Sequence, residues 1–252
     1  MSETFHLLTF LSIATLIQHT TQQNDLSLSN FASRFSSCKM YSKEFDNCIK
    51  KALNDVRPWF KTGLPELNIA PFDPFFAKEV IQKRGGRNLN YKLKLTDVFE
   101  RGWTVSEVTK FKYNPELNSV RYTQFFPEKY LEGAYEMETQ MAQLSRMQNK
   151  GVWNMTLYNY MQTTTISRPK DAKTLKVRIE VDKIGNMDLH VSNLLRGRNV
   201  LEGIMDRIIN ASWRPGFAVI RPLINDIVST AFTDIFNKAF NNLNIYAILP
   251  SP

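Results

Sequence analysis

The chain has 252 residues, of which 43% are hydrophobic and 22% are charged. This composition predicts a globular protein with a large core and excludes a mainly disordered chain, while length alone allows one or two domains. The formal charge of +8 permits contact with nucleic acid, an anionic membrane or an acidic substrate. The densest basic group, Lys83, Arg84 and Arg87 around Gly85-Gly86, is typical of a solvated turn. Because no clustered basic stripe is visible, we expect no nucleic-acid binding.

Residues 7–17 form an apolar run that is too short to span a bilayer, which takes about 20 residues. Its position favours the apolar part of a secretory signal, although Glu3 and not a Lys or Arg precedes it. We expect residues 1–22 to be a signal peptide, with cleavage placed only loosely between Gln18 and Asn24. Residues 23–252 then form one mature domain, and the protein is secreted.

Cysteine and asparagine residues agree with secretion. The two cysteines, Cys38 and Cys48, are close enough in the sequence to close a small loop by a disulfide, and two free thiols in a cytosolic protein are the alternative. Such a disulfide is worth about 3 kcal/mol in the chain-entropy model. Asn154 and Asn210 both begin N-glycosylation triplets, but Asn210 falls on an expected helix, where modification is disfavoured.

An amphipathic run follows Cys48 and predicts a helix of about four turns that Gly63 and Pro65 end. Its apolar face consists of Ile49, Ala52, Leu53, Val56, Trp59 and Phe60. Upstream, Phe31 and Phe35 are four residues apart and are the only hint of another helical turn. Downstream, we expect a loop that contains Phe75, Phe76 and Val80.

Between residues 89 and 191 the hydrophobic period changes from 3.6 to 2, which predicts strands. The strands fall near residues 89–95, 103–113, 120–126, 131–145, 153–161, 175–181 and 187–191. A shift of the alternation within 103–113 indicates a bulge. Long strands joined by short turns predict an antiparallel meander with a polar outer face and an apolar inner face.

The stretch from Asn199 to Asn242 repeats apolar residues at helical spacing for far longer than an ordinary surface helix does. At the helical rise, about 40 residues make an element roughly 60 Å long, which exceeds the width of a compact domain of this size. Pro215 and Pro222 lie inside the pattern without resetting its period, so we expect bends and not a break. Such an element requires an elongated structure around it.

Several of these segments, taken in order, resemble a known family. The series is Cys38-x9-Cys48, Val56-Arg57-Pro58-Trp59-Phe60, Gly63-Leu64-Pro65, Pro71-Phe72-Asp73-Pro74-Phe75-Phe76, Asn193-Leu194-Leu195, Ile209 to Arg214, Ile220 to Ile224 and Ala247 to Pro250. It resembles the insect takeout family, which includes the haemolymph juvenile-hormone-binding proteins. The resemblance implies the tubular lipid-binding fold, an α+β domain in which a strongly curved antiparallel sheet wraps a long C-terminal helix, with a short N-terminal helix. It also implies a small hydrophobic ligand of the terpenoid hormone, fatty acid or semiochemical class.

Signatures of enzymes are absent from the sequence, which has no G-x-S-x-G, H-E-x-x-H, P-loop or C-x-x-C motif. Removal of the signal peptide leaves His190 as the only histidine, so a catalytic triad or a two-histidine metal site would have to use it or do without. Alternation places His190 on the solvent face between Leu189 and Val191. We therefore expect no enzyme activity, no metal and no cofactor.

Large apolar side chains are abundant, with 17 Phe, 9 Met, 9 Tyr and 4 Trp, and most of them are expected to form the core. The small helix residues Ala231 and Ala239, together with methionines on inner strand faces, favour a channel instead of a filled core. We expect the ligand to be enclosed by Val56, Trp59, Phe60, Phe75, Phe76, Val80, Met137, Met141, Trp153, Met155, Phe217, Ile224, Val228 and Phe232.

The sequence thus predicts a monomeric, secreted carrier of a small hydrophobic ligand. Two alternatives stay open. The positive charge could dock the molecule transiently on an anionic membrane for lipid transfer between bilayers, in which case binding would be sensitive to salt. The protein could also be a secreted signalling protein that contacts a receptor, with a tunnel that is only structural.

Overall fold

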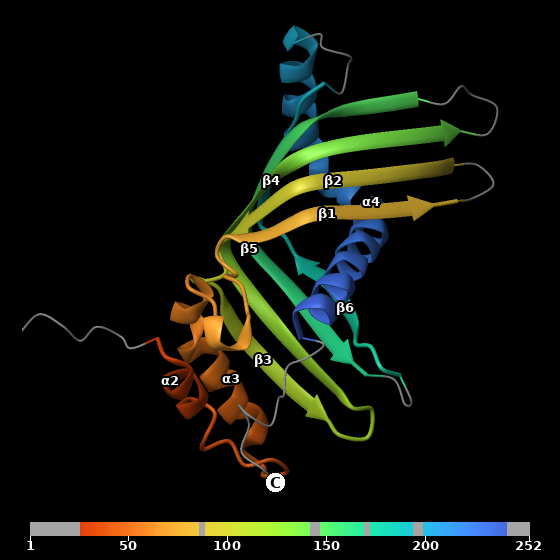
Figure 1. Ribbon diagram of the computed structural model, residues 1–252. Coiled ribbons are helices and arrows are strands. Elements are labelled where there is room, and N and C mark those ends of the chain that lie inside the picture. Colours follow the sequence, from red (N-terminus) through yellow and green to blue (C-terminus); the bar gives the residue numbers. More distant parts are fainter. Residues whose placement is uncertain (1–25, 86–88, 142–146, 169–171, 194–198, 241–252) are drawn as a thin grey trace, which may run out of the picture.

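The computed structural model describes residues 26–85, 89–141, 147–168, 172–193 and 199–240 (Figure 1). The fold is α+β and consists of a seven-stranded antiparallel sheet, an N-terminal helical region and a long C-terminal helix. The helices are α2 (Leu28–Ser33), α3 (Phe45–Asp55), α4 (Asn199–Phe240) and the short 3₁₀ helices η1 (Arg57–Phe60) and η2 (Pro65–Leu67). The expected signal peptide, residues 1–22, lies outside the described residues.

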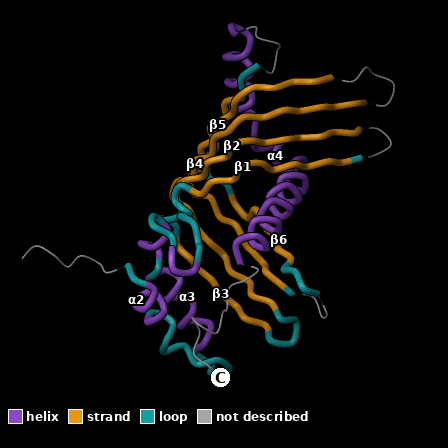
Figure 2. The backbone as a smooth tube through the Cα atoms, in the orientation of Figure 1, coloured by secondary structure: helices purple, strands orange, loops and turns teal. Residues whose placement is uncertain are grey.

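The sheet bends into two halves that share two long strands. The strands are β1 (Phe75–Arg84), β2 (Leu89–Arg101), β3 (Glu107–Asn114), β4 (Ser119–Met141), β5 (Met147–Ser167), β6 (Lys176–Lys183) and β7 (Asn186–Val191). The halves share the long strands β4 and β5. The lower half also contains β3 and β6, and the upper half also contains β1, β2 and β7. The strand order is β1-β2-β4-β5-β6, while β3 pairs with β4 in the lower half and β7 pairs with β5 in the upper half. Figure 2 shows β4 and β5, of 23 and 21 residues, running through the bend between the halves.

The two long strands change their inward face at the same level of the bend. On β4, two exposed residues separate buried Phe126 from buried Lys129. On β5, two residues that are not buried separate buried Leu157 from buried Tyr160. Asn159 lies at this level with a positive φ of 48°. The division into separate strands at 120–126 and 131–145 is therefore wrong, because the shift of alternation is an irregularity inside one strand.

The segment expected to be a loop, residues 75–80, is in fact part of strand β1. Buried Phe75 and Ala77 are followed by two exposed residues, Lys78 and Glu79, and then by half-buried Val80, so the alternation changes phase. The change occurs beside Asp97 of β2, which has a positive φ of 51° and stands at a register shift between β2 and β4. A strand with such a phase change does not show a period of two.

Prolines act differently in the two helical regions. The expected four-turn helix after Cys48 divides into α3 and η1, because Pro58 disfavours the α-helical conformation in the residue before it. In contrast, α4 continues through Pro215 and Pro222 as one helix, and Figure 1 shows it changing direction along its length. The prediction of one long bent helix is therefore confirmed for residues 199–240.

Two apolar cores hold these elements together. The larger core lies inside the curved sheet and joins strand residues such as Phe126 to Phe232 of α4. The smaller core lies under the N-terminal helices around Ile49 and contains the disulfide between Cys38 and Cys48. The predicted disulfide is confirmed, and the alternative of two free thiols is wrong.

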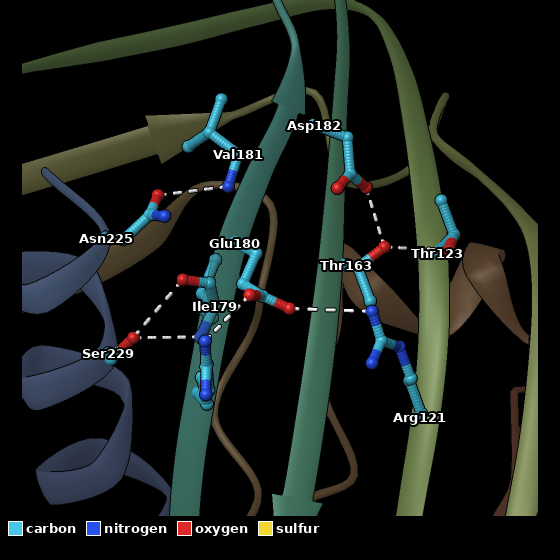
Figure 3. Close-up of polar contacts among 10 residues, drawn as sticks. Arg121, Thr123, Thr163, Ile179, Glu180, Val181, Asp182, Asn225 and Ser229 are labelled. Atoms are coloured by element: carbon cyan, nitrogen blue, oxygen red, sulfur yellow. Dashed lines mark hydrogen bonds and ion pairs between the residues drawn. The ribbon is translucent and has the colours of Figure 1, made fainter. Parts of the chain in front are cut away.

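Helix α4 is attached to the edge of the open sheet by a repeat of polar side chains. It packs along β6 and β7 and also contacts β1 (Figure 1). Four side chains spaced by four residues bond backbone groups spaced by two residues: Asn225 to Val181, Ser229 to Ile179, Thr233 to Val177 and Asn237 to Leu175. Figure 3 shows the contacts of Asn225 and Ser229. Four residues of helix rise about 6 Å and two residues of strand about 6.6 Å, so the repeats stay in step.

Helix α3 caps the opposite edge of the lower half in a similar way. Asn54 accepts a hydrogen bond from the backbone N–H of Val108 at 2.9 Å and donates to its carbonyl at 3.0 Å. Asp46 accepts a hydrogen bond from the backbone N–H of Tyr113 at 2.9 Å. Unpaired edge groups are a template for pairing with other chains, so both helices protect the sheet that they flank.

The attachment of α4 predicts a specific effect of Thr233→Val. The hydroxyl of Thr233 accepts from the N–H and donates to the carbonyl of Val177, both at 3.0 Å, so its removal leaves two backbone groups unpaired. We expect the free energy of unfolding to fall by about 1–3 kcal/mol in urea titrations. The matched control Thr230→Val, on the exposed face of α4, should change it by less than about 0.5 kcal/mol. Equal effects of the two variants would contradict the edge attachment.

Candidate ligand-binding cavity

A cavity of about 320 Å³ lies where the N-terminal helices, the lower half of the sheet and the end of α4 meet. Its aromatic lining consists of Phe31, Trp59, Phe60, Phe72, Trp103, Phe111, Tyr122, Phe232 and Phe236. Aliphatic residues complete most of the wall, namely Leu53, Leu64, Ile69, Val108, Val120 and Ile166. Three parts of the chain that are distant in sequence thus line one apolar space.

Contacts between aromatic rings fix the walls of this cavity. The indole N–H of Trp59 donates to the carbonyl of Leu26 at 2.9 Å, and its ring packs edge-on against Phe31. Trp103 contacts both Phe72 and Phe232, with 6.1 Å between ring centroids in each case. Edge-to-face and tilted pairs at such distances are favourable. The rings therefore hold the N-terminal region, the sheet and α4 in one arrangement.

The polar residues of the wall are bonded to one another and to the backbone. Arg57 donates to the carbonyls of Asn54 and Ser106, at 2.8 and 2.6 Å. Gln124 donates to the hydroxyl of Ser106 at 2.6 Å, and that hydroxyl donates to the carbonyl of Trp103 at 2.6 Å. Gln124 and Ser106 are 4% and 0% exposed. The bonds of Ser106 and Gln124 satisfy polar groups that would otherwise disfavour an apolar ligand.

A buried ion pair lies behind the cavity wall at the bend of the sheet. The ammonium group of Lys129 contacts a carboxylate oxygen of Glu100. Both side chains are buried, with 5% and 6% of their surface exposed. The same ammonium lies 4.6 Å from the ring centroid of Trp103, 4.3 Å from Phe126 and 5.2 Å from Tyr160. Burial lowers the pKa of Lys129, and the charge of Glu100 acts against this shift.

Comparison with known proteins assigns the chain to a family. The model of the family described as haemolymph juvenile hormone binding protein matches residues 11–250. The chain belongs to this family. The crystal structure of Takeout 1 from Epiphyas postvittana has the same fold as this chain, with a TM-score of 0.56 and 16% sequence identity. The alignment covers 82% of this chain and 97% of Takeout 1.

Two further comparisons contribute less. The crystal structure of a lipopolysaccharide binding protein aligns with a TM-score of 0.27 and 9% identity over 79% of this chain and 38% of that protein, a level that supports no conclusion. No curated protein matches the chain. The resemblance to the takeout and juvenile-hormone-binding family that the sequence motifs indicate is confirmed by the family model and by the shared fold.

The residues expected to contact the ligand fall into three groups in the structure. Trp59, Phe60 and Phe232 line the cavity. Phe76 and Met137 are 48% and 37% exposed, and the side chain of Met141 lies outside the described residues. The others belong to the two cores or pack against them, namely Val56, Phe75, Val80, Trp153, Met155, Phe217, Ile224 and Val228. Contact of any of these residues with a ligand stays a prediction.

Several lining residues were not among the expected ligand contacts. Tyr122, Gln124 and Val120 lie on β4, and Phe111 lies on β3, so all belong to the lower half of the sheet. The alternation of Val120 and Tyr122 does point them inward, but it does not show which half of the sheet holds an open space. Arg57 was also missed, because a basic residue on a short helix is normally solvated.

His190 of β7 has a partner on α4. Its side chain is 45% exposed, and its Nδ1 lies 2.5 Å from an oxygen of Asp206 on α4. This exposure agrees with the predicted solvent face, and α4, which packs beside β7, supplies Asp206 as a partner. In the described part of the chain, no group of three His, Cys, Asp or Glu residues could hold a metal ion. No described helix is long and apolar enough to cross a bilayer.

The asparagines of both glycosylation triplets, Asn154 on β5 and Asn210 on α4, are half-buried. The amide of Asn210 donates to the carbonyl of Leu189 at 3.1 Å and accepts from its N–H at 2.8 Å. A glycan on Asn210 would occupy the nitrogen that makes the first of these bonds, so the geometry disfavours modification there. Glycosylation of either residue stays a prediction.

The buried pair behind the cavity predicts a strong and non-additive response to mutation. Lys129→Met leaves the carboxylate of Glu100 buried without its partner, so the free energy of unfolding should fall by about 3–5 kcal/mol. The double variant with Glu100→Leu should recover most of this loss. Arg101→Met, which breaks an exposed pair with Glu132, is the control and should cost less than about 1 kcal/mol. Additive losses in urea titrations would contradict the pairing.

Proposed function

We propose that the protein is a secreted carrier that encloses a small hydrophobic ligand in the 320 Å³ cavity. The observation that carries the proposal is the apolar wall built from three separate parts of the chain. Ligand sites of this kind are concave and mostly apolar, with few polar groups. Membership of the haemolymph juvenile hormone binding protein family supports a carrier of hydrophobic ligands.

The hydrogen bonds of the wall favour an apolar ligand over a polar one. Because Asn54, Ser106 and Gln124 already bond to the protein, an apolar group that enters the cavity breaks no hydrogen bond. Its transfer from water then contributes roughly 25 cal/mol for each Å² of apolar surface buried. A strongly polar ligand would lose its bonds to water and find few partners in return.

The size of the cavity limits the ligand. At about 30 Å³ for a water-sized group, the space holds on the order of ten such groups. This supports a short-chain member of the terpenoid hormone, fatty acid or semiochemical classes.

Filling the cavity should weaken ligand binding and leave the fold intact. Val120 and Ile166 are paired across β4 and β5 and both line the cavity, so Val120→Phe places a larger ring in the space. We expect the dissociation constant of the apolar fluorescent probe N-phenyl-1-naphthylamine to rise by about tenfold or more, which is about 1.4 kcal/mol. Leu117→Phe, at a residue that is 67% exposed, is the matched control and should bind like wild type.

The outcomes for this pair of variants separate two accounts. Unchanged probe binding by Val120→Phe would show that the probe binds elsewhere and would remove the support for the cavity as the site. A fall in thermal stability of Val120→Phe would show that the site is filled core, because overpacking destabilises a filled site.

Secretion can be tested with the full chain expressed in insect cells. We expect the protein in the medium to begin near residue 23 by N-terminal sequencing and to contain the Cys38–Cys48 disulfide. Recovery of a chain that starts at Met1 from the cell lysate, with both cysteines open to alkylation, would contradict secretion.

A further inference from the structure

The guanidinium group of Arg57 stands out among the charged groups of the molecule. It is half-buried at the start of η1 and lines the cavity. Its Nε and one terminal nitrogen donate to the carbonyls of Asn54 and Ser106. Both acceptors are neutral, and within the described residues no carboxylate lies within ion-pair distance of Arg57. Among the described residues, its positive charge is therefore not balanced by a carboxylate.

The surroundings of Arg57 hold its side chain in one orientation. Ser106 is fully buried, and its hydroxyl is fixed between the carbonyl of Trp103 and the amide of Gln124. Asn54 is fixed by its two bonds to the backbone of Val108. Arginine has five N–H donors, so two bonds to the protein leave part of the fork available. The group is thus positioned in advance for an additional acceptor.

The pairing of a fixed cation with an apolar cavity suits a ligand with an acidic head and an apolar tail. A cation in apolar surroundings is stabilised most by a hydrogen-bonded anion, and arginine matches the two oxygens of a carboxylate. Beyond the polar group around Arg57, aromatic and aliphatic side chains form the wall, including Phe60, Phe72 and Phe232.

We propose that Arg57 is the anchor for a ligand carboxylate and that the carrier selects unesterified carboxylic acids with an apolar chain of about ten carbon atoms. The proposal rests on the proposed carrier function. It distinguishes free acids from esters, alcohols and hydrocarbons of equal length, because only the free acid supplies an anion to Arg57. The half-buried position of Arg57 also allows the head group to stay near water while the chain is enclosed.

The test compares decanoic acid with methyl decanoate, measured by displacement of N-phenyl-1-naphthylamine at pH 7.5. Wild type should bind the acid about tenfold or more tightly than the ester. Arg57→Met should lose this preference and keep its affinity for the ester, while Arg57→Lys should keep part of the preference. Arg34→Met, which removes an exposed arginine that does not line the cavity, should behave as wild type.

The outcomes distinguish failure of the anchor from failure of the carrier. Equal affinities of wild type for acid and ester would overturn the role of Arg57 and leave the carrier function standing. Binding of neither compound, nor of the probe, would contradict the carrier function itself. Because Arg57→Met also removes two hydrogen bonds to the backbone, its fold is checked by circular dichroism. If it does not fold, the test is the ratio of the dissociation constants of ester and acid in wild type and in Arg57→Lys. A ratio near one in wild type overturns the proposal.

Discussion

The structure depends on side chains that bond to the backbone at the edges of an open sheet. Asn225, Ser229 and Thr233 connect α4 to β6, Asn237 connects it to Leu175 just before β6, and Asn54 connects α3 to β3. The sheet does not close on itself, so each helix takes the place of a neighbouring strand. The match between four residues of helix and two residues of strand makes this possible over several turns. The space between the two helices and the lower half of the sheet is the cavity.

The same bonds set the rotation of α4 about its axis. Each polar residue that bonds β6 follows an apolar residue by one position, and successive residues on a helix are about 100° apart. When Thr233 and Asn237 face the edge of β6, Phe232 and Phe236 therefore face the interior, where they line the cavity. A helix attached only by apolar contacts could rotate or slide with little loss. The polar repeat thus positions the aromatic wall that the ligand meets.

The sequence predicts the elements whose signal is local. Periodicity identifies α4 and most strands, and spacing identifies the disulfide of Cys38 and Cys48. Periodicity does not identify β1 or the continuity of β4, because irregular residues such as Asp97 and Asn159 shift the alternation. The cavity could not be located, since its walls come from segments more than 150 residues apart that only tertiary packing brings together. The repeat of Asn225 and Ser229 has the spacing of a solvent-exposed helix face. The sequence alone therefore does not distinguish a polar face that bonds a sheet edge from one that faces water.

The central claim is that the cavity between the N-terminal helices, the lower sheet and α4 holds an apolar ligand. The most direct measurement is a crystal structure of the protein purified from the expression medium. Our account predicts continuous electron density of an elongated small molecule between Trp59, Phe111 and Phe232, with one end near Arg57. A cavity in which these side chains have collapsed onto one another, or one filled only by ordered water, would contradict the account.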